Sequence, residues 1–200
     1  MLTLKKIAIT GGIASGKTSV CRILKKHGAC ALNSDQIIHR LLNEDPSCIN
    51  ETIKLLGSEI LTDGKIDRKK VAEIVFNDGK KLESLEKILH PKLFVEIDRE
   101  YARVKEDKSY KFFAVEMPLI QELGKDSTFD YIVAVLSTKD NASKRMTQKG
   151  FSEKAYEERM RWQWSGEKKA KNADYVINND GTVEELEKNI LEMMKEISSQ

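Results

Sequence analysis

The chain has 200 residues, which is enough for one α/β domain with a small inserted subdomain but tight for two full domains. Its 34 basic and 32 acidic residues leave a formal net charge of +2, a balance that argues against a nucleic-acid coat or a membrane-surface binder. No apolar run reaches the roughly 18 to 20 residues of a membrane span. We therefore expect a cytoplasmic globular protein that binds neither nucleic acid nor membranes, and the composition leaves its oligomeric state open.

The cysteines are Cys21, Cys30 and Cys48, an odd number without C-x-x-C or zinc-ligand spacing. We expect reduced thiols that fill apolar positions.

Five short apolar runs predict β-strands, and helical patterns alternate with them. The runs cover residues 5–10, 29–32, 111–115, 131–136 and 175–177. Strands that alternate with helices predict an α/β fold with a doubly wound, mostly parallel five-stranded sheet of the P-loop kinase type. Ligands of such sheets lie beyond the carboxyl ends of the strands, so we look for the site there.

Two helical regions interrupt this alternation. Residues from about 46 to 108 show only helical patterns, with breaks at Asp63-Gly64 and Asn77-Asp78-Gly79, and predict a helical insertion. A short polar helix is expected to end near Gly124, between the third and fourth strands. Residues from about 139 to 171 are strongly charged and helical, and are predicted to form a lid. A final amphipathic helix is expected from Thr182 onward.

The loop after the first strand fits the pattern G-x-x-x-x-G-K-[ST] in full. Its residues are Gly11, Gly12, Ile13, Ala14, Ser15, Gly16, Lys17 and Thr18. Glycines let the backbone N–H groups converge on a phosphate, and the following helix adds the positive end of its dipole. Lys17 is expected to reach the β- and γ-phosphates of ATP, and the Thr18 hydroxyl to coordinate Mg²⁺.

The rest of the chain favours a kinase over a GTP-hydrolysing switch, because neither N-K-x-D nor D-x-x-G occurs as a guanine-reading or switch motif. Asp35 follows the second strand, where a carboxylate can orient an acceptor hydroxyl and accept its proton. Asp is also a favoured residue for capping the helix that follows. Both roles for Asp35 stay open at this point.

Most of the basic residues in the region 139–171 are expected to lie on solvated helix faces. They are Lys144, Arg145, Lys149, Lys154, Arg159, Arg161, Lys168, Lys169 and Lys171. Some are expected to neutralise the transferring phosphoryl group and help to exclude water from it. Arg145, which follows the fourth strand, is the best candidate for that catalytic role.

His90 precedes Pro91 within the helical insertion. A proline disfavours α geometry for the residue before it, so a break or kink is expected here. The pattern favours a structural role for this break over a catalytic one.

Several segments resemble dephospho-CoA kinases, nearly from end to end. The opening I-T-G-G-I-A-S-G-K-T is similar to the extended P-loop of that family, with Ala14 where a glycine is usual, and N-S-D at 33–35 is similar to its D-A-D motif, with Asn33 in place of the first aspartate. The segments L-H-P at 89–91, M-P-L-I-Q-E at 117–122 and A-D-Y-V-I-N-N at 173–179 follow in the family's order.

The resemblance implies transfer of the terminal phosphoryl group of ATP to the ribose 3′-hydroxyl of dephospho-CoA, with a helical CoA-binding subdomain. It implies that Asp35 orients this hydroxyl, that His90 and Pro91 belong to the acceptor side, and that Arg145 and Gln163 belong to the lid and nucleotide face. Asn179, in the last of these segments, is expected at the nucleotide. Lys149 stands where the family often has an arginine, and lysine cannot make the same planar bidentate contact.

Two alternatives remain open. One is a kinase of another small hydroxyl acceptor, such as a nucleoside, nucleotide or sugar-like alcohol. The other is a regulatory or RNA-associated ATPase that hydrolyses its nucleotide without an acceptor, which the near-neutral charge disfavours.

Overall fold

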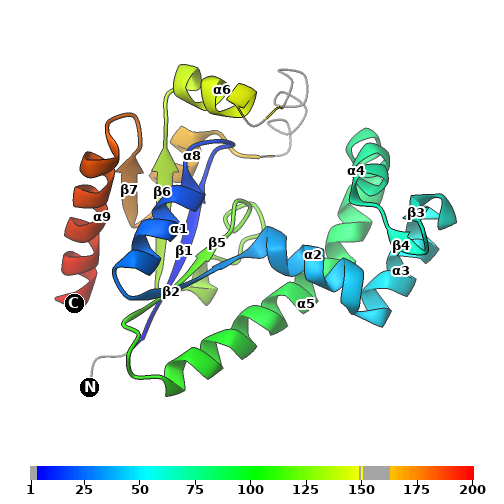
Figure 1. The fold of residues 1–200 in the computed structure, drawn as a ribbon, viewed down its shortest axis with the longest axis horizontal. Coiled ribbons are helices and arrows are strands. Elements are labelled where there is room, and N and C mark those ends of the chain that lie inside the picture. Colours follow the sequence, from blue (N-terminus) through cyan, green and yellow to red (C-terminus); the bar gives the residue numbers. More distant parts are fainter. Residues whose placement is uncertain (1–3, 149, 151–162) are drawn as a thin grey trace. The chain divides into compact units, whose positions relative to one another are not determined.

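The computed structural model describes residues 4–148, 150 and 163–200. These residues form two compact units, one made of Met1–Asn33 with Val104–Gln200 and the other of Ser34–Arg103 (Figure 1). The second unit begins earlier in the chain than the helical insertion expected from about 46. No helix in the described ranges is long and apolar enough to cross a membrane.

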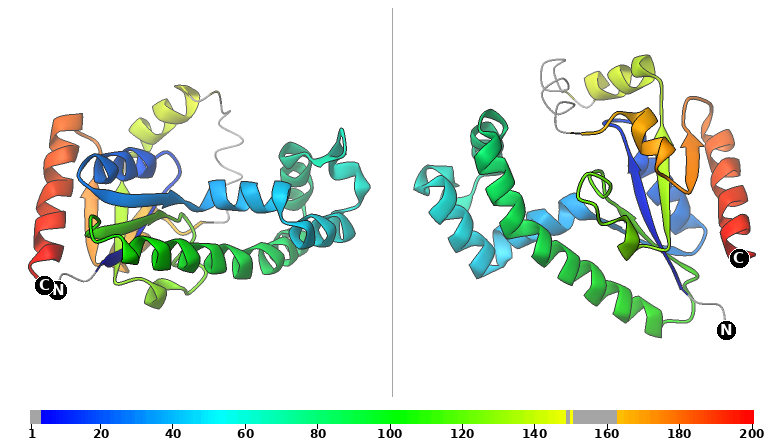
Figure 2. Two further views of the ribbon diagram at one scale, coloured as in Figure 1. Left: turned by 60° about the horizontal axis from the view of Figure 1, so that its bottom comes forward. Right: turned by 180° about the vertical axis from the view of Figure 1, so that it is seen from behind.

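The first unit is built on a parallel five-stranded sheet, as predicted. Its strands are β1 (Lys5–Gly11), β2 (Ala29–Asn33), β5 (Phe112–Glu116), β6 (Tyr131–Leu136) and β7 (Tyr175–Asn178). They lie in the order β2-β5-β1-β6-β7, so β1 is central and is flanked by β5 and β6 (Figures 1 and 2). The loop that follows β1 therefore begins at the middle of the carboxyl edge of the sheet.

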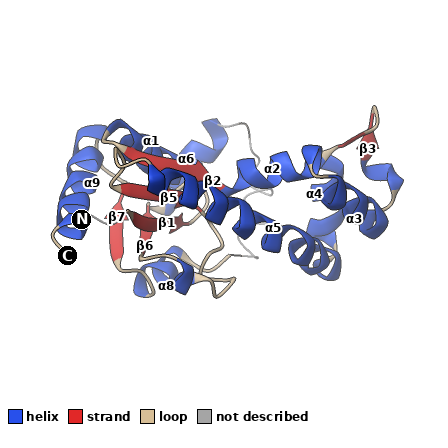
Figure 3. Cartoon of the chain, turned by 90° about the horizontal axis from the view of Figure 1, so that it is seen from below, coloured by secondary structure: helices blue, strands red, loops and turns tan. Residues whose placement is uncertain are grey.

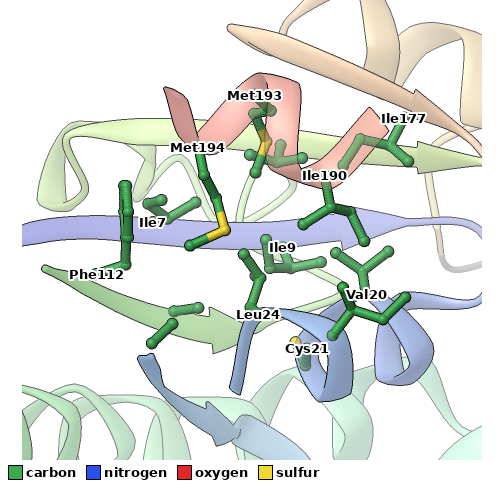
Figure 4. Packing of buried hydrophobic residues seen from close by; sticks show 14 of the residues in the cluster. Ile7, Ile9, Val20, Cys21, Leu24, Phe112, Ile177, Ile190, Met193 and Met194 are labelled. Atoms are coloured by element: carbon green, nitrogen blue, oxygen red, sulfur yellow. The ribbon is translucent and has the colours of Figure 1, made fainter. Parts of the chain in front are cut away.

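Helices cover both faces of this sheet. They are α1 (Lys17–Lys26), α8 (Gly166–Lys171) and α9 (Val183–Ser198), whereas α6 (Lys139–Gln148) follows β6 beyond the end of the sheet (Figure 1). On one face, Ile7 and Ile9 of β1 pack with apolar residues of α1 and α9, such as Leu24 and Ile190 (Figure 4). Successive side chains of a strand point to opposite faces, so Thr10 turns to the other face, where α8 packs on β1 and β6.

The final helix begins where the sequence predicts. The Thr182 hydroxyl accepts a hydrogen bond from the backbone N–H of Glu185, and the Glu185 carboxylate accepts one from the N–H of Thr182. This reciprocal cap satisfies two N–H groups that would otherwise lack partners at the start of α9.

The second unit is mostly helical (Figure 3). Its elements are α2 (Ser34–Glu44), α3 (Pro46–Leu56), a short 3₁₀ helix (Ser58–Ile60), α4 (Arg68–Asn77) and most of α5 (Gly79–Glu106). The expected absence of strands is wrong in one place, because β3 (Leu61–Thr62) and β4 (Lys65–Ile66) form a small antiparallel hairpin. Asp63 and Gly64 form its turn, both with positive φ. Two-residue strands are too short to show an alternating apolar pattern.

A break or a kink was expected at His90-Pro91, and the break is wrong, because α5 runs through Pro91 as one continuous helix. A proline inside a helix costs about 3 kcal/mol. Four buried residues at intervals of four offset this cost: Leu85, Leu89, Leu93 and Ile97 are at most 6% exposed. Burying each such side chain contributes about 1.5–3 kcal/mol, so tertiary packing outweighs the local penalty.

The short polar helix expected before Gly124 is replaced by turns, followed by a 3₁₀ helix at Asp126–Thr128. Side chains of this segment bond to α8 instead. The Gln121 amide donates hydrogen bonds to the carbonyl oxygens of Lys169 and Asn172, at 2.9 Å each. These tertiary bonds hold the segment in a shape that the local sequence pattern does not indicate.

Candidate active site

The glycine-rich loop connects β1 to α1, and two of its glycines are required by geometry. Gly11 has φ of 142°, and a Cβ there would lie 2.3 Å from the carbonyl oxygen of Val135. Gly16 has φ of 104°, and a Cβ there would lie 1.9 Å from Nδ2 of Asn179. Any other residue would therefore disturb β6 or the residues after β7.

Ala14 is the one non-glycine residue of this loop with positive φ, at 56°. The left-handed region costs an alanine about 1–2 kcal/mol, a strain that glycine does not have. The sequence singles out this position as a departure from the usual glycine, and the backbone shows that the loop keeps the left-handed shape regardless.

Lys17 is buried at the start of α1, and its Nζ donates hydrogen bonds to the carbonyl oxygens of Gly11 at 3.0 Å and Gly12 at 2.7 Å. Its ammonium thus lies directly at the loop. The nearby Ser15 hydroxyl is buried and has no hydrogen-bond partner in the described part of the chain. The Lys17 ammonium and the Ser15 hydroxyl both lie at the N-terminus of α1. A cation together with a hydroxyl that has no hydrogen-bond partner among the described residues suits an anionic phosphate.

A carboxylate that is absent from the predicted site lies beside Thr18. Glu116, the last residue of β5, is 7% exposed. Its Oε1 accepts a hydrogen bond from the Thr18 hydroxyl at 2.9 Å, and its Oε2 accepts one from the Asn33 amide, also at 2.9 Å. The signal available in the sequence was the position of Glu116 directly after the third predicted strand, at the end of the strand where ligands of such sheets bind.

Arg145 and Asn179 close the other side of the loop. The guanidinium of Arg145 donates to the carbonyl oxygens of Ser15 at 3.3 Å and Asn179 at 2.7 Å, and to the Ser137 hydroxyl at 3.0 Å. The Asn179 amide donates to the carbonyl oxygen of Ser15 at 2.7 Å. Two predicted site residues far apart in the sequence thus meet on the phosphate loop.

Asp180 fixes the segment that carries Arg145. Its Oδ1 accepts hydrogen bonds from the Ser137 hydroxyl, from the backbone and hydroxyl of Thr138, and from the Asn141 amide, at 2.8–3.0 Å. Desolvation of the carboxyl raises its pKa, but these hydrogen bonds outweigh it and lower the pKa to about 2. The start of α6 is therefore held to the residues after β7.

A groove of about 610 Å³ runs from this loop along α1 to the start of α9. Lys17, Thr18, Glu116, Arg145 and Asn179 contribute to its wall. Its size and its mixture of a helix N-terminus, several cations and two carboxylates, Glu116 and Glu187, fit a nucleoside triphosphate with a divalent cation.

A buried ion pair lies on the opposite face of the sheet. Lys169 was expected to share a solvated helix face with the other basic residues, yet its side chain is fully buried. Its Nζ donates to both carboxylate oxygens of Glu122, at 2.7 and 2.8 Å, and to the Pro118 carbonyl at 2.6 Å. Burial lowers the pKa of Lys169, and the hydrogen bond to Glu122 opposes that shift.

The same carboxylate holds the segment that contains Gln163. Glu122 Oε1 accepts a hydrogen bond from the backbone N–H of Trp164 at 2.8 Å. The side-chain oxygen of Gln163 is buried and lacks a donor among the residues that the structure describes. Of the predicted lid, Lys149 and residues 151–162 lie outside the described residues.

Three further predicted site residues belong to the second unit. Asp35 lies within the first turn of α2, which begins at Ser34, so it does not occupy the capping position. His90 is half-buried in α5, and burial lowers its pKa, which leaves its imidazole neutral at pH 7. Pro91 follows it at an exposed position.

A family model described as "Dephospho-CoA kinase" matches residues 5–185 of the chain. The chain belongs to the dephospho-CoA kinase family. A curated dephospho-CoA kinase of Protochlamydia amoebophila is 41% identical over 199 residues, which cover 98% of each chain.

Two solved structures have the same fold. A protein of Thermus thermophilus matches with a TM-score of 0.83 and 28% identity, over 97% of this chain and 98% of its own. The dephospho-CoA kinase of Campylobacter jejuni matches with a TM-score of 0.69 and 27% identity, over 97% of each chain. The α/β architecture with its phosphate loop is thus the fold of the dephospho-CoA kinase family.

Proposed function

We propose that this protein transfers the γ-phosphoryl group of ATP to the ribose 3′-hydroxyl of dephospho-CoA, which gives coenzyme A in the last step of its synthesis. The observation that carries the proposal is the match of nearly the whole chain to the dephospho-CoA kinase family. It is supported by a phosphate loop whose geometry is intact and whose lysine lies at the loop.

On the donor side, the backbone of residues 11–18 and the ammonium of Lys17 bind the phosphates of ATP. The two carbonyl groups that now accept from Lys17 are weaker partners than phosphate oxygens, so the lysine can exchange one set for the other. Mg²⁺, with the Thr18 hydroxyl as a ligand, would neutralise charge on the β- and γ-phosphates when bound.

Arg145 and Asn179 bind the nucleotide beyond the phosphates. Their hydrogen bonds to the carbonyl oxygen of Ser15 place them on the loop itself, and both contribute to the wall of the groove. Arg145 also provides a positive charge near the phosphoryl group that is transferred.

On the acceptor side, Asp35 orients the 3′-hydroxyl and accepts its proton. His90 and Pro91 bind dephospho-CoA within the helical subdomain of about 46–108, and Gln163 binds substrate through its side-chain oxygen, which has no hydrogen-bond donor among the described residues. The region of about 139–171 closes as a lid over the reacting groups and excludes water.

We also propose that the enzyme works in the cytoplasm. All three cysteines are free thiols, and Cys21 and Cys48 are buried. Free thiols of this kind suit a reducing compartment.

The decisive experiment is incubation with Mg²⁺-ATP and dephospho-CoA, with coenzyme A and ADP measured by chromatography and mass spectrometry. We expect equal amounts of the two products. A panel of nucleosides, nucleotides and sugar alcohols serves as the comparison. Release of ADP without coenzyme A, or a faster reaction with another acceptor, would overturn the proposal.

The role of Asp35 has its own test. Asp35→Asn is expected to reduce turnover by roughly 10²- to 10⁴-fold, because the amide cannot accept the proton of the hydroxyl. The affinity for ATP, measured by calorimetry, should stay within a few-fold of the unmodified enzyme. Normal turnover by the variant would remove Asp35 from its role as the base.

A further inference from the structure

The buried ammonium of Lys169 contacts the strand that leads into the phosphate loop, and the proposed mechanism does not use it. Its side chain is fully buried on the face of the sheet where α8 packs on β1 and β6. Besides the carboxylate of Glu122, Nζ donates to the Pro118 carbonyl at 2.6 Å and to the Thr10 hydroxyl at 3.4 Å. That hydroxyl also donates to the Pro118 carbonyl, at 3.0 Å. One cation thus connects three segments that are far apart in the sequence.

On the β1 side, the contact is one residue from the phosphate loop. Thr10 precedes Gly11, whose carbonyl oxygen accepts a hydrogen bond from Lys17. Gly11 is packed closely against β6, since a Cβ there would lie 2.3 Å from the Val135 carbonyl oxygen. Because the two residues are covalently linked, the position of the Thr10 side chain bears directly on the start of the loop.

On the β5 side, the contact is two residues from a carboxylate of the candidate site. Pro118 follows Glu116, whose Oε1 accepts a hydrogen bond from the Thr18 hydroxyl. Between them, the Met117 N–H donates to the Ile9 carbonyl at 2.9 Å and extends the pairing of β1 with β5. The ammonium bonds just beyond this backbone hydrogen bond. It therefore fixes the chain where the sheet ends.

Stability alone does not explain why a lysine occupies this position. Taking an ammonium out of water is costly, and replacing a buried ion pair by apolar residues of similar volume is often neutral or stabilising. An ammonium differs from an apolar side chain in making directional hydrogen bonds, with three protons to donate. At Lys169 these bonds hold oxygen atoms of Thr10 and Pro118, one on each of the two neighbouring strand ends.

We propose that Lys169 is a positioning residue for phosphoryl transfer, whose ammonium sets the place of the phosphate loop relative to the segment that carries Glu116. The proposal rests on the proposed function, because it concerns the rate of that reaction. Lys169 acts through Thr10 and Pro118. Enzymes that transfer phosphoryl groups depend on positioning and on charge, so a small displacement of the loop is enough to slow the reaction.

The first test uses Lys169→Met/Glu122→Leu, in which apolar side chains replace both members of the ion pair. We expect a folded protein whose kcat for coenzyme A formation is about 10- to 100-fold lower, with the KM for ATP within about threefold of the unmodified value. The loop backbone and Lys17 still bind the phosphates, whereas the alignment needed in the transition state is lost. Normal kcat in the folded variant would refute the proposal, and so would an effect confined to KM.

Ile197→Ala is the matched control for a loss of stability. Ile197 is fully buried in the same unit, near the far end of α9 and about 20 Å of helix away from Val183 at the groove. We expect it to lower the midpoint of urea unfolding and to leave kcat unchanged. If it reduced kcat as much as the Lys169 variant does, weakened folding would be the cause and the proposal would be wrong.

Amide hydrogen exchange gives a second readout that needs no acceptor. In Lys169→Met/Glu122→Leu, the Met117 N–H should exchange about tenfold faster relative to the Ala114 N–H in the middle of β5, whereas Ile197→Ala should keep the ratio of the two rates. An unchanged ratio in the Lys169 variant would refute the proposal. If the unmodified protein forms no coenzyme A, the proposed function fails, and the exchange ratio still decides whether Lys169 holds these two segments.

Lys169→Met/Glu122→Gln serves if the apolar pair does not fold. The amide oxygen at position 122 can still accept the hydrogen bond from the Trp164 N–H, so this variant removes the two charges and keeps that contact. We expect the same fall in kcat and the same change in the exchange ratio. The absence of either would contradict the proposal.

Discussion

Removing the buried ammonium of Lys169 should be among the most damaging single changes in the sheet unit. In Lys169→Met, the Glu122 carboxylate, whose side chain is only 14% exposed, loses the cation that lies 2.7 Å away. The Pro118 carbonyl loses a donor at 2.6 Å and the Thr10 hydroxyl one at 3.4 Å. Breaking a buried ion pair from one side costs about 3–5 kcal/mol, out of a total stability of roughly 5–15 kcal/mol.

Urea unfolding followed by far-UV circular dichroism measures this cost. With a slope of about 2 kcal/mol per molar urea, the loss lowers the midpoint by roughly 1.5–2.5 M. Lys168→Met is the control in the same helix, because Lys168 is exposed and its Nζ lies 3.6 Å above the Trp164 ring. That contact contributes about 0.5–1 kcal/mol, so the control midpoint should move by less than about 0.5 M.

Lys169→Met/Glu122→Leu separates the charge from the packing. Replacing both members of a buried pair by apolar residues is often neutral or stabilising, so the double variant should be more stable than Lys169→Met. A Lys169→Met protein no less stable than Lys168→Met would refute the reasoning.

Three further predictions concern the phosphate loop, Asp180 and the thiols. Ala14→Gly should raise stability by up to about 1 kcal/mol, seen as a higher thermal midpoint, because the relief of left-handed strain exceeds the entropy that glycine adds to the unfolded chain; a lower midpoint would contradict this. The lowered pKa of Asp180 means that its contribution to stability is complete above its unfolded pKa of about 3.9 and is lost as pH falls through about 2. The stability advantage of the unmodified protein over Asp180→Asn should accordingly disappear near pH 2. An advantage that does not change with pH would show that ionisation of the Asp180 carboxyl is not its cause. Burial raises the pKa of Cys21 to about 12 and of Cys48 to about 11, so a maleimide at pH 7 should label Cys30 first and all three thiols only in denaturant; rapid labelling of Cys21 in the native protein would contradict this.

The sequence predicts the sheet and the phosphate loop because both depend on local patterns. Continuous apolar runs mark the five strands, and the spacing of the glycines and Lys17 marks the loop. The continuous α5 was beyond prediction, since the penalty at Pro91 is local whereas the burial that offsets it depends on tertiary packing. The hairpin of β3 and β4 is too short to leave a pattern.

The sequence predicts those residues of the site that belong to a recognisable motif. Arg145 and Asn179 lie on the loop as nucleotide residues should, although their roles stay predictions. Glu116 was absent from the predicted site because a single carboxylate after a strand has no motif of its own. Lys169 resembles its solvated neighbours in the sequence, and only the packing of α8 on β1 and β6 distinguishes it.

The central place of β1 has a consequence for synthesis on the ribosome. The strand that carries the phosphate loop emerges first, yet both of its partners, β5 and β6, lie more than 100 residues later in the chain. Loop closure over such a distance is slow, and parallel pairing gives no stability before it is complete. The nucleotide site therefore forms late, and a nascent chain that ends before Tyr131 should be unable to retain ATP.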